Sequence, residues 1–172
     1  MKETFKLGRY LFIVCTVAGF ALAGTNYLTE KKIQEQKLKA EQEALIAVLR
    51  NATDFKPQHS YLMGYDPGHN PVGYILKVKA AGYSSPIEAL VGIDRKFKIT
   101  GLKIISQNET PGLGSKIAEP GFLDQFIGKV SAKVLLKKDG GSIDGVTAAT
   151  VSSRAITNAI RKQIDEFKTI VQ

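Results

Sequence analysis

The feature that most constrains this chain is a run of nineteen residues without charge, from Tyr10 to Leu28. As an α-helix this run would be about 28 Å long, which is close to the thickness of the hydrocarbon core of a bilayer. Basic residues precede the run, and Glu30, Lys31 and Lys32 close it. We therefore expect residues 10–28 to form a single membrane-spanning anchor.

The same segment also fits a cleaved secretory signal, with a basic start, an apolar core and Ala21-Leu22-Ala23 as the cleavage site. A lipoprotein signal is excluded, because Val14 before Cys15 is too bulky for that position. Basic residues nearly balance on the two sides of the run, so charge leaves its orientation open. The run contains no ionisable Asp, Glu, Lys or Arg, so the sequence predicts an anchor and not an ion path.

Composition excludes several classes of protein. The 172 residues have room for one globular domain and an accessory element. The net charge is +8, but the lysines are scattered and no helix-turn-helix or RNA-binding signature occurs, so we expect no nucleic-acid partner. A single cysteine excludes an internal disulfide, and neither His59 nor His69 belongs to a metal-ligand pattern. We expect no metal site.

The segment after the anchor is rich in Glu, Gln, Lys, Ala and Leu with apolar residues at helical spacing, so residues 29–51 are expected to form a juxtamembrane helix. A coiled-coil stalk is the alternative, although fewer than three clean heptads are available. Residues 53–71 contain three prolines and two glycines, which predicts an irregular connection.

The rest of the chain predicts an α+β fold, an antiparallel sheet packed with helices, over residues 52–172. Alternating apolar residues and turn signals predict a meander of three strands. A periodic apolar face predicts a long final helix. The expected strands are 72–81, 86–93, 97–106 and 132–136, and the expected helices are 121–128 and 151–171.

Thr150 lies where the final helix is expected to begin. Its hydroxyl suits an N-cap, which accepts a hydrogen bond from a free backbone N–H group of the first turn. The same position also suits a phosphate site, because the free N–H groups and the helix dipole favour negative charge. The two interpretations differ in whether the hydroxyl is free or esterified.

A second loop, from Glu109 to Lys116, contains a prolyl turn with two glycines. The Gly-Lys-Ser/Thr order of a phosphate-binding P-loop is absent, so that interpretation is rejected. Pro111, Gly112 and Gly114 expose the backbone and permit close approach of a flat ligand, although a tight turn has the same composition.

Residues 144–150, Asp-Gly-Val-Thr-Ala-Ala-Thr, resemble the D-x-x-[ST]-[GA]-A-T signature read by flavin transferases, which join FMN to the last Thr. The commoner form of the signature has Gly at the position of Ala148. Residues 109–114 resemble the other hallmark of the same FMN-binding domain. The domain is found in the RnfG protein of the Rnf electron-transport complex and in the NqrC protein of the sodium-pumping NADH:quinone oxidoreductase. The resemblance covers nearly the whole chain. The length of this chain favours RnfG over NqrC.

The resemblance implies a flavoprotein that carries FMN on Thr150 through a phosphoester bond. It further implies that Thr147, Ala148 and Ala149 line the phosphate end, that Thr110, Pro111, Gly112 and Leu113 lie against the isoalloxazine, and that Asp144 serves the transferase. No catalytic residue is expected, because the chain would relay electrons as one component of an ion-translocating oxidoreductase linked to ferredoxin and NAD. Its expected partners are the flavin transferase and the other subunits, which would hold the ion path.

The resemblance also implies that the anchor is retained in the cytoplasmic membrane. Residues 1–9 would then be cytoplasmic and the flavin domain extracytoplasmic. Two alternatives remain: the equivalent NqrC protein of the quinone reductase, and a redox-inert extracytoplasmic binding domain. An independent enzyme would need a nucleophile–base pair, of which the two histidines give no sign.

Overall fold

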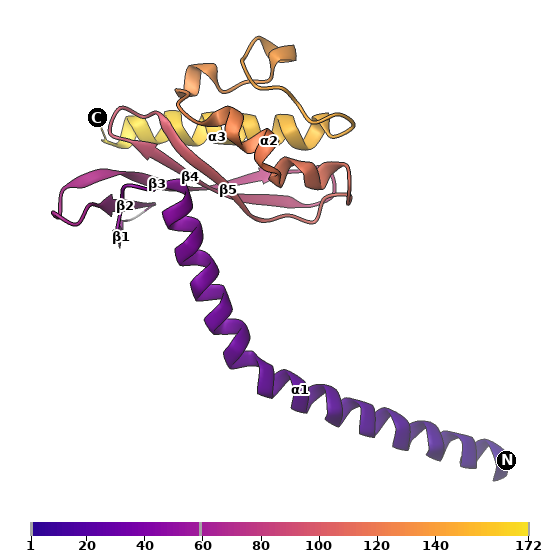
Figure 1. Cartoon of the computed structure of the whole chain (residues 1–172). Helices are drawn as coiled ribbons and strands as arrows, with labels where there is room; N and C mark the ends of the chain where they lie inside the picture. The colour runs from indigo at the N-terminus through magenta and orange to yellow at the C-terminus, as the bar shows by residue number, and fades with distance from the viewer. Residues whose placement is uncertain (1, 59, 172) are drawn as a thin grey trace. The chain divides into compact units, whose positions relative to one another are not determined.

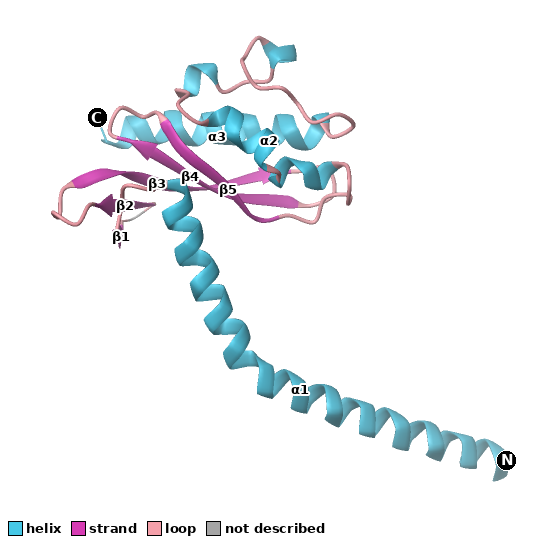
Figure 2. Cartoon of the chain, in the orientation of Figure 1, coloured by secondary structure: helices cyan, strands magenta, loops and turns pink. Residues whose placement is uncertain are grey.

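The computed structural model describes residues 2–58 and 60–171 (Figures 1 and 2). His59 lies outside the described residues. The chain divides into two compact units, Met1–Glu41 and Gln42–Gln172.

The first unit consists of the greater part of helix α1, which runs from Lys2 to Val48 without interruption. Within it, Gly8–Glu30 is long and apolar enough to cross a membrane. The Thr16 hydroxyl donates to the Phe12 carbonyl at 2.7 Å, and Thr25 donates to Ala21 at 2.8 Å. These bonds satisfy the polar hydroxyls within the helix, as an apolar environment requires. The expected helix over 10–28 is confirmed, and its length and composition also fit a signal sequence.

The second unit is built on a five-stranded antiparallel sheet whose strands follow one another in chain order. The strands are β1 Asp54–Pro57, β2 Tyr61–Tyr65, β3 Pro71–Ala81, β4 Pro86–Asp94 and β5 Ile99–Ser106. Neighbouring residues of β3, such as Ile75 and Leu76, are both buried. Since successive side chains point to opposite faces, the sheet is covered on both sides.

One face of the sheet is covered by the final helix, α3, which runs from Thr150 to Val171. Its apolar stripe packs on β3, and Phe167 lies against the rings of Tyr61, Tyr74 and Phe97. Short helices between β5 and α3 complete this layer: α2 Pro120–Leu123 and the 3₁₀ helices η1 Gly114–Ala118, η2 Asp124–Phe126, η3 Ser131–Lys133 and η4 Lys137–Asp139.

The other face receives the last turns of α1. Leu45, Val48 and Leu49 are buried there against Ile75 of β3 and Leu90 of β4. Backbone contact is close, because a Cβ atom added to Gly101 would lie 2.6 Å from the Cα of Val48. Glycine in the strands therefore makes room for the end of the helix.

The fold class is confirmed, and so are the strands β3, β4 and β5, the short helix near 121–128 and the final helix. The expected irregular connection over 53–71 is wrong, because this segment contains the strands β1 and β2. The expected strand over 132–136 is also wrong. Its apolar residues Val134 and Leu136 are buried, but they belong to a looped segment in which only Leu136 forms a β-bridge, to Ile143.

Candidate functional site

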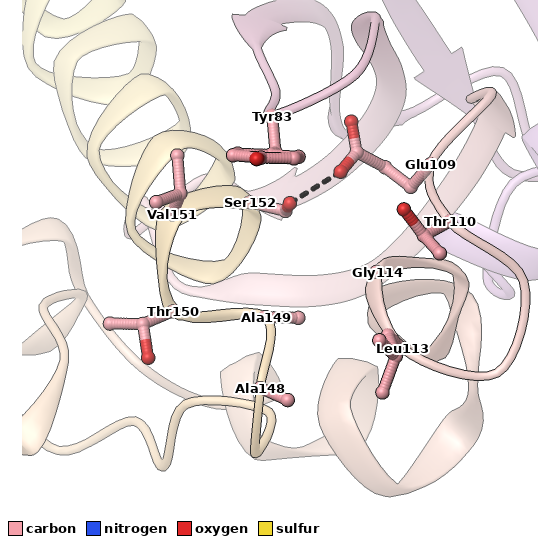
Figure 3. Close-up of a pocket in the computed structure, with 10 residues that line it drawn as sticks. All are labelled: Tyr83, Glu109, Thr110, Leu113, Gly114, Ala148, Ala149, Thr150, Val151 and Ser152. Carbon is pink, nitrogen blue, oxygen red and sulfur yellow. Dashed lines mark hydrogen bonds between the residues drawn. The ribbon is translucent and has the colours of Figure 1, made fainter.

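A cavity of about 430 Å³ opens beside the N-terminal end of α3 (Figure 3). Three segments of the chain form its walls: the turn after β3, the loop after β5 and the first turn of α3. Its volume lies within the range of about 300–1,000 Å³ that is typical of small-molecule sites. Tyr83, Leu113 and Val151 contribute apolar side chains to the cavity and are themselves exposed.

Glu109 is buried in the wall, with only 5% of its surface exposed. Its Oε1 atom accepts hydrogen bonds from the backbone N–H groups of Ser84 at 3.0 Å and Ser85 at 3.3 Å. Its Oε2 atom accepts from the hydroxyl of Ser152 at 2.5 Å. Burial raises the pKa of this carboxyl, but the bonds from Ser152 and the two N–H groups outweigh it and hold the pKa below its ordinary value. Glu109 is therefore ionised at neutral pH.

The first turn of α3 begins after a tight turn over residues 146–149, in which the Ala149 N–H donates to the Val146 carbonyl at 3.0 Å. Ala148 has a φ of 63°, in the left-handed region that favours glycine. Ser153 fixes this turn to the helix, since its hydroxyl accepts from the Val146 N–H at 3.0 Å and donates to the Ala149 carbonyl at 2.9 Å.

Thr150 is the first residue of α3, and the residue before it is Ala149, which has no capping side chain. The expected N-cap role of Thr150 is therefore not what the structure shows. Thr150 lines the cavity as a residue, and its half-buried side chain hydrogen-bonds to none of the described residues. The first N–H groups of a helix have no partner within the helix, so this end of the cavity is suited to an anion.

The structure brings together most of the site residues that the sequence predicts. Thr110, Leu113, Ala148, Ala149 and Thr150 all line the cavity. Pro111, Gly112 and Thr147 are exposed and lie outside its lining.

Asp144 also lies outside the cavity, on the surface. Its carboxylate pairs with Lys137 at 2.7 Å, and both side chains are more than half exposed. The side-chain amide of Gln125 holds the Asp144 backbone, accepting from its N–H at 2.7 Å and donating to its carbonyl at 3.3 Å. This position suits recognition by another protein better than contact with a ligand in the cavity.

Sequence reasoning missed the roles of four residues that line the cavity, Tyr83, Glu109, Val151 and Ser152, whereas Gly114 belongs to the loop whose glycines were expected to admit a flat ligand. Glu109 had a signal, since it opens the loop motif and is an acidic residue in an otherwise uncharged stretch. The only sequence signal for Ser152 was its place near the start of a helix. Tyr83 and Val151 had no sequence signal, because their place in the cavity wall depends on the packing of segments that are distant in the chain.

Comparison with known proteins agrees with this geometry. Residues 82–165 match the model of the FMN-binding domain, and residues 1–48 match that of the RnfG N-terminal region. The chain is 32% identical to the G subunit of the ion-translocating oxidoreductase complex of Methanosarcina acetivorans, over 95% of this chain and 94% of that protein. The chain belongs to the RnfG family. A second member, the G subunit of the Na(+)-translocating ferredoxin:NAD(+) oxidoreductase complex of Acetobacterium woodii, is 33% identical over 98% of this chain and 94% of its own.

Two solved structures share the fold of this RnfG-family protein. The C subunit of the Na(+)-translocating NADH-quinone reductase of Parabacteroides distasonis aligns with a TM-score of 0.53 at 23% identity, over 65% of this chain and 62% of that one. NqrC of Shewanella oneidensis aligns with a TM-score of 0.51 at 17% identity, over 70% and 73% of the two chains. At these identities the likeness concerns the fold alone.

The cavity fits the FMN that its domain family binds. The exposed apolar side chains Tyr83 and Leu113 suit a flat aromatic ring, and the start of α3 suits a phosphate. Ala148 and Ala149 are small, so a ligand can approach the helix end closely. The cavity lining has no basic side chain, so the backbone N–H groups and the helix dipole are what this wall offers to an anion.

Proposed function

We propose that this RnfG-family protein carries FMN in the cavity, joined by a phosphoester bond to the Thr150 hydroxyl, and relays electrons within a membrane-bound, ion-translocating oxidoreductase. One observation carries the proposal: the last Thr of the flavin-transferase signature is a cavity residue at the first position of α3, with a hydroxyl that bonds to none of the described residues. A hydroxyl held in a structural hydrogen bond would be poorly suited to modification.

The start of α3 would hold the phosphate. A phosphodiester retains one negative charge, and the positive end of the helix dipole stabilises a charge at this position. Ala148 and Ala149 line the same end of the cavity, while Thr110, Leu113 and Tyr83 line its remainder, where the isoalloxazine would lie. Pro111 and Gly112 would shape the loop that presents Leu113, and Thr147 would belong to the surface that the transferase recognises together with Asp144.

Bound FMN supplies chemistry that accepts and donates electrons singly or in pairs. The chain's own residues bind and orient it. No independent activity is proposed, and the other subunits of the complex are the partners for electron exchange. Relatives of the chain are named as G subunits of ferredoxin:NAD(+) oxidoreductase complexes that translocate sodium ions or protons. Residues 10–28 of the candidate span contain no Asp, Glu, Lys or Arg and so offer no ionisable path, and we assign ion movement to other subunits.

The covalent bond is tested by co-expressing the full chain with a flavin transferase. The intact mass should rise by one FMN with loss of water, and the denatured band should fluoresce under ultraviolet light. Thr150→Ala should abolish both signals. Thr110→Ala is the matched control, because it removes another cavity hydroxyl and should keep the adduct. An unmodified mass in the parent protein would exclude the proposal and favour a redox-inert domain.

We further propose that the anchor is retained and that the flavin domain is extracytoplasmic. A covalent bond suits that compartment, where lost cofactor could not be replaced from the cytoplasm. Cys15 is the only cysteine, so Cys15→Ser allows a reporter cysteine at exposed Lys98. A membrane-impermeant maleimide should label it in intact spheroplasts. Labelling only after lysis would place the domain in the cytoplasm, and N-terminal sequencing would reveal cleavage.

A further inference from the structure

Glu109 joins two walls of the cavity that come from distant parts of the chain. Its Oε1 atom holds the backbone of Ser84 and Ser85, in the turn that presents Tyr83, and its Oε2 atom holds Ser152, in the first turn of α3. Figure 3 shows the Ser152 and Glu109 side chains pointing toward one another across the cavity wall. Among the residues that line the cavity, Glu109 alone has a carboxylate or a basic group.

The surrounding backbone is shaped around this carboxylate. A Cβ atom added to Gly114 would lie 2.7 Å from the Cβ and 2.9 Å from the Oε2 of Glu109, and one added to Gly82 would collide with its Oε1. Such contacts are too close for any residue with a side chain. Two glycines thus leave room for a single buried acid.

A buried charge is expensive unless hydrogen bonds compensate it. Here three donors do so, and every buried polar side-chain atom of the described residues has a partner. An apolar side chain could brace the same two segments by packing alone, without desolvation of a charge. The presence of a compensated carboxylate beside a cavity therefore points to an electrostatic function as well as a structural one.

We propose that Glu109 is a positioning residue with two effects on the cavity: its carboxylate holds the Tyr83 turn against α3, and its negative charge disfavours the addition of electrons to a flavin bound there. The second effect rests on the proposed function, because it requires a flavin in the cavity. The first is a property of the protein chain alone. Charges close to the ring are among the means by which proteins tune a flavin, and a water-poor wall strengthens their effect.

Three variants separate geometry from charge. Glu109→Gln removes the charge but keeps the shape, since its carbonyl oxygen can accept from Ser84 and Ser85 while its amide donates to the Ser152 hydroxyl, which turns to accept. Ser152→Ala keeps the charge and removes one of the donors. Glu109→Ala removes both the charge and the bonds.

The charge effect is tested by redox titration of the full-length, flavin-loaded protein in detergent. Glu109→Gln should raise the midpoint potential by about 30 mV, which corresponds to a tenfold change in a two-electron equilibrium. Ser152→Ala should shift the potential less, because the charge remains. A Glu109→Gln protein with the parent's potential would overturn the charge effect.

The bracing effect is tested without any flavin, by hydrogen exchange of the backbone amides of Ser84 and Ser85 in the Thr150→Ala protein. Adding Glu109→Ala should accelerate their exchange about tenfold, because each loses its acceptor. Adding Glu109→Gln should leave it near the Thr150→Ala rate. An unchanged exchange rate in the Glu109→Ala protein would overturn the proposal that Glu109 holds the Tyr83 turn against α3.

The two measurements also separate this proposal from the proposed function. A parent protein that carries no flavin after co-expression with a transferase would refute the flavin assignment, and the charge effect with it. The exchange measurement would still decide whether Glu109 ties the turn to the helix. If Glu109→Ala does not fold, Ser152→Ala replaces it as the test variant. It should accelerate hydrogen exchange of the backbone amides in the first turn of α3. Unchanged exchange of those amides would overturn the proposal that Glu109 connects the turn to the helix.

Discussion

The hydroxyl of Thr100 donates a hydrogen bond of 2.6 Å to the backbone carbonyl of Val48, and so ties strand β5 to the last turn of α1. Val48 is fully buried at this point. The carbonyls of a final helical turn have no partner within the helix, so the hydroxyl satisfies one that burial would otherwise leave unpaired. The end of α1 is thus an integral part of the second unit.

The first prediction concerns the close contact beneath this bond. Gly101→Ala should destabilise the protein by about 1–3 kcal/mol, because its Cβ would press against the Val48 backbone, which cannot move as a side chain tip can. Gly121→Ala is the control, since nothing lies within 4 Å of the Cβ it would add. Denaturant unfolding of the full chain in detergent measures both. Equal stability of the two variants would show that the helix end is not held as described.

The second prediction concerns Ala148, whose φ of 63° is unfavourable for any residue with a side chain. Ala148→Gly should stabilise the protein by about 0.5–1 kcal/mol, because relief of left-handed strain outweighs the added freedom of the unfolded chain. Ala132→Gly, at an exposed position without positive φ, should instead be neutral or destabilising. Thermal unfolding measures whether each variant is stabilised or destabilised. A destabilised Ala148→Gly protein would exclude backbone strain at Ala148.

How well the sequence predicts the sheet differs from strand to strand. Strands β3 and β4 are predicted to within one residue at each end, because they are long and bounded by clear turn signals. Strands β1 and β2 escape prediction, because they are short and contain Pro57 and Gly64. Tertiary packing makes them strands: β2 pairs with β3, and Gly64 leaves space for the side chain of Leu49.

The residues of the site also differ in how well the sequence predicts them. Thr150 and Ala148 stand in a contiguous signature, so the resemblance names them directly, and the structure places both at the cavity. The hydrogen bond between Glu109 and Ser152 joins residues 43 positions apart. No local pattern reports such a contact, because each partner alone looks like an ordinary loop acid or helix serine. A contiguous motif therefore predicts only the residues that it contains, and the fold determines which distant residues support them.

The third prediction concerns the effect of pH on stability through Glu109. Its pKa in the folded protein lies below the value of 4.5 expected in the unfolded chain. The unfolded state therefore binds the proton more readily, and the contribution of this carboxylate is present above that value and is lost as the pH falls through the folded pKa. The stability difference between the Thr150→Ala protein and its Glu109→Gln derivative should shrink as the pH is lowered from 6 to below 4. A constant difference over that range would contradict the pKa direction.

The fourth prediction concerns the exposed acid of the flavin-transferase signature. Asp144→Asn should lower attachment of FMN by about tenfold under limiting transferase, the effect of losing one charged contact with the modifying enzyme. The melting temperature should stay unchanged, because Asp144 pairs only with exposed Lys137 and its backbone contacts with Gln125 remain. Lys137→Ala is the matched control: it removes the same ion pair but keeps the acid, so it should load FMN normally. Intact mass over a time course measures attachment, and equal loss in both variants would show that the ion pair, and not the Asp144 carboxylate, is what the transferase requires.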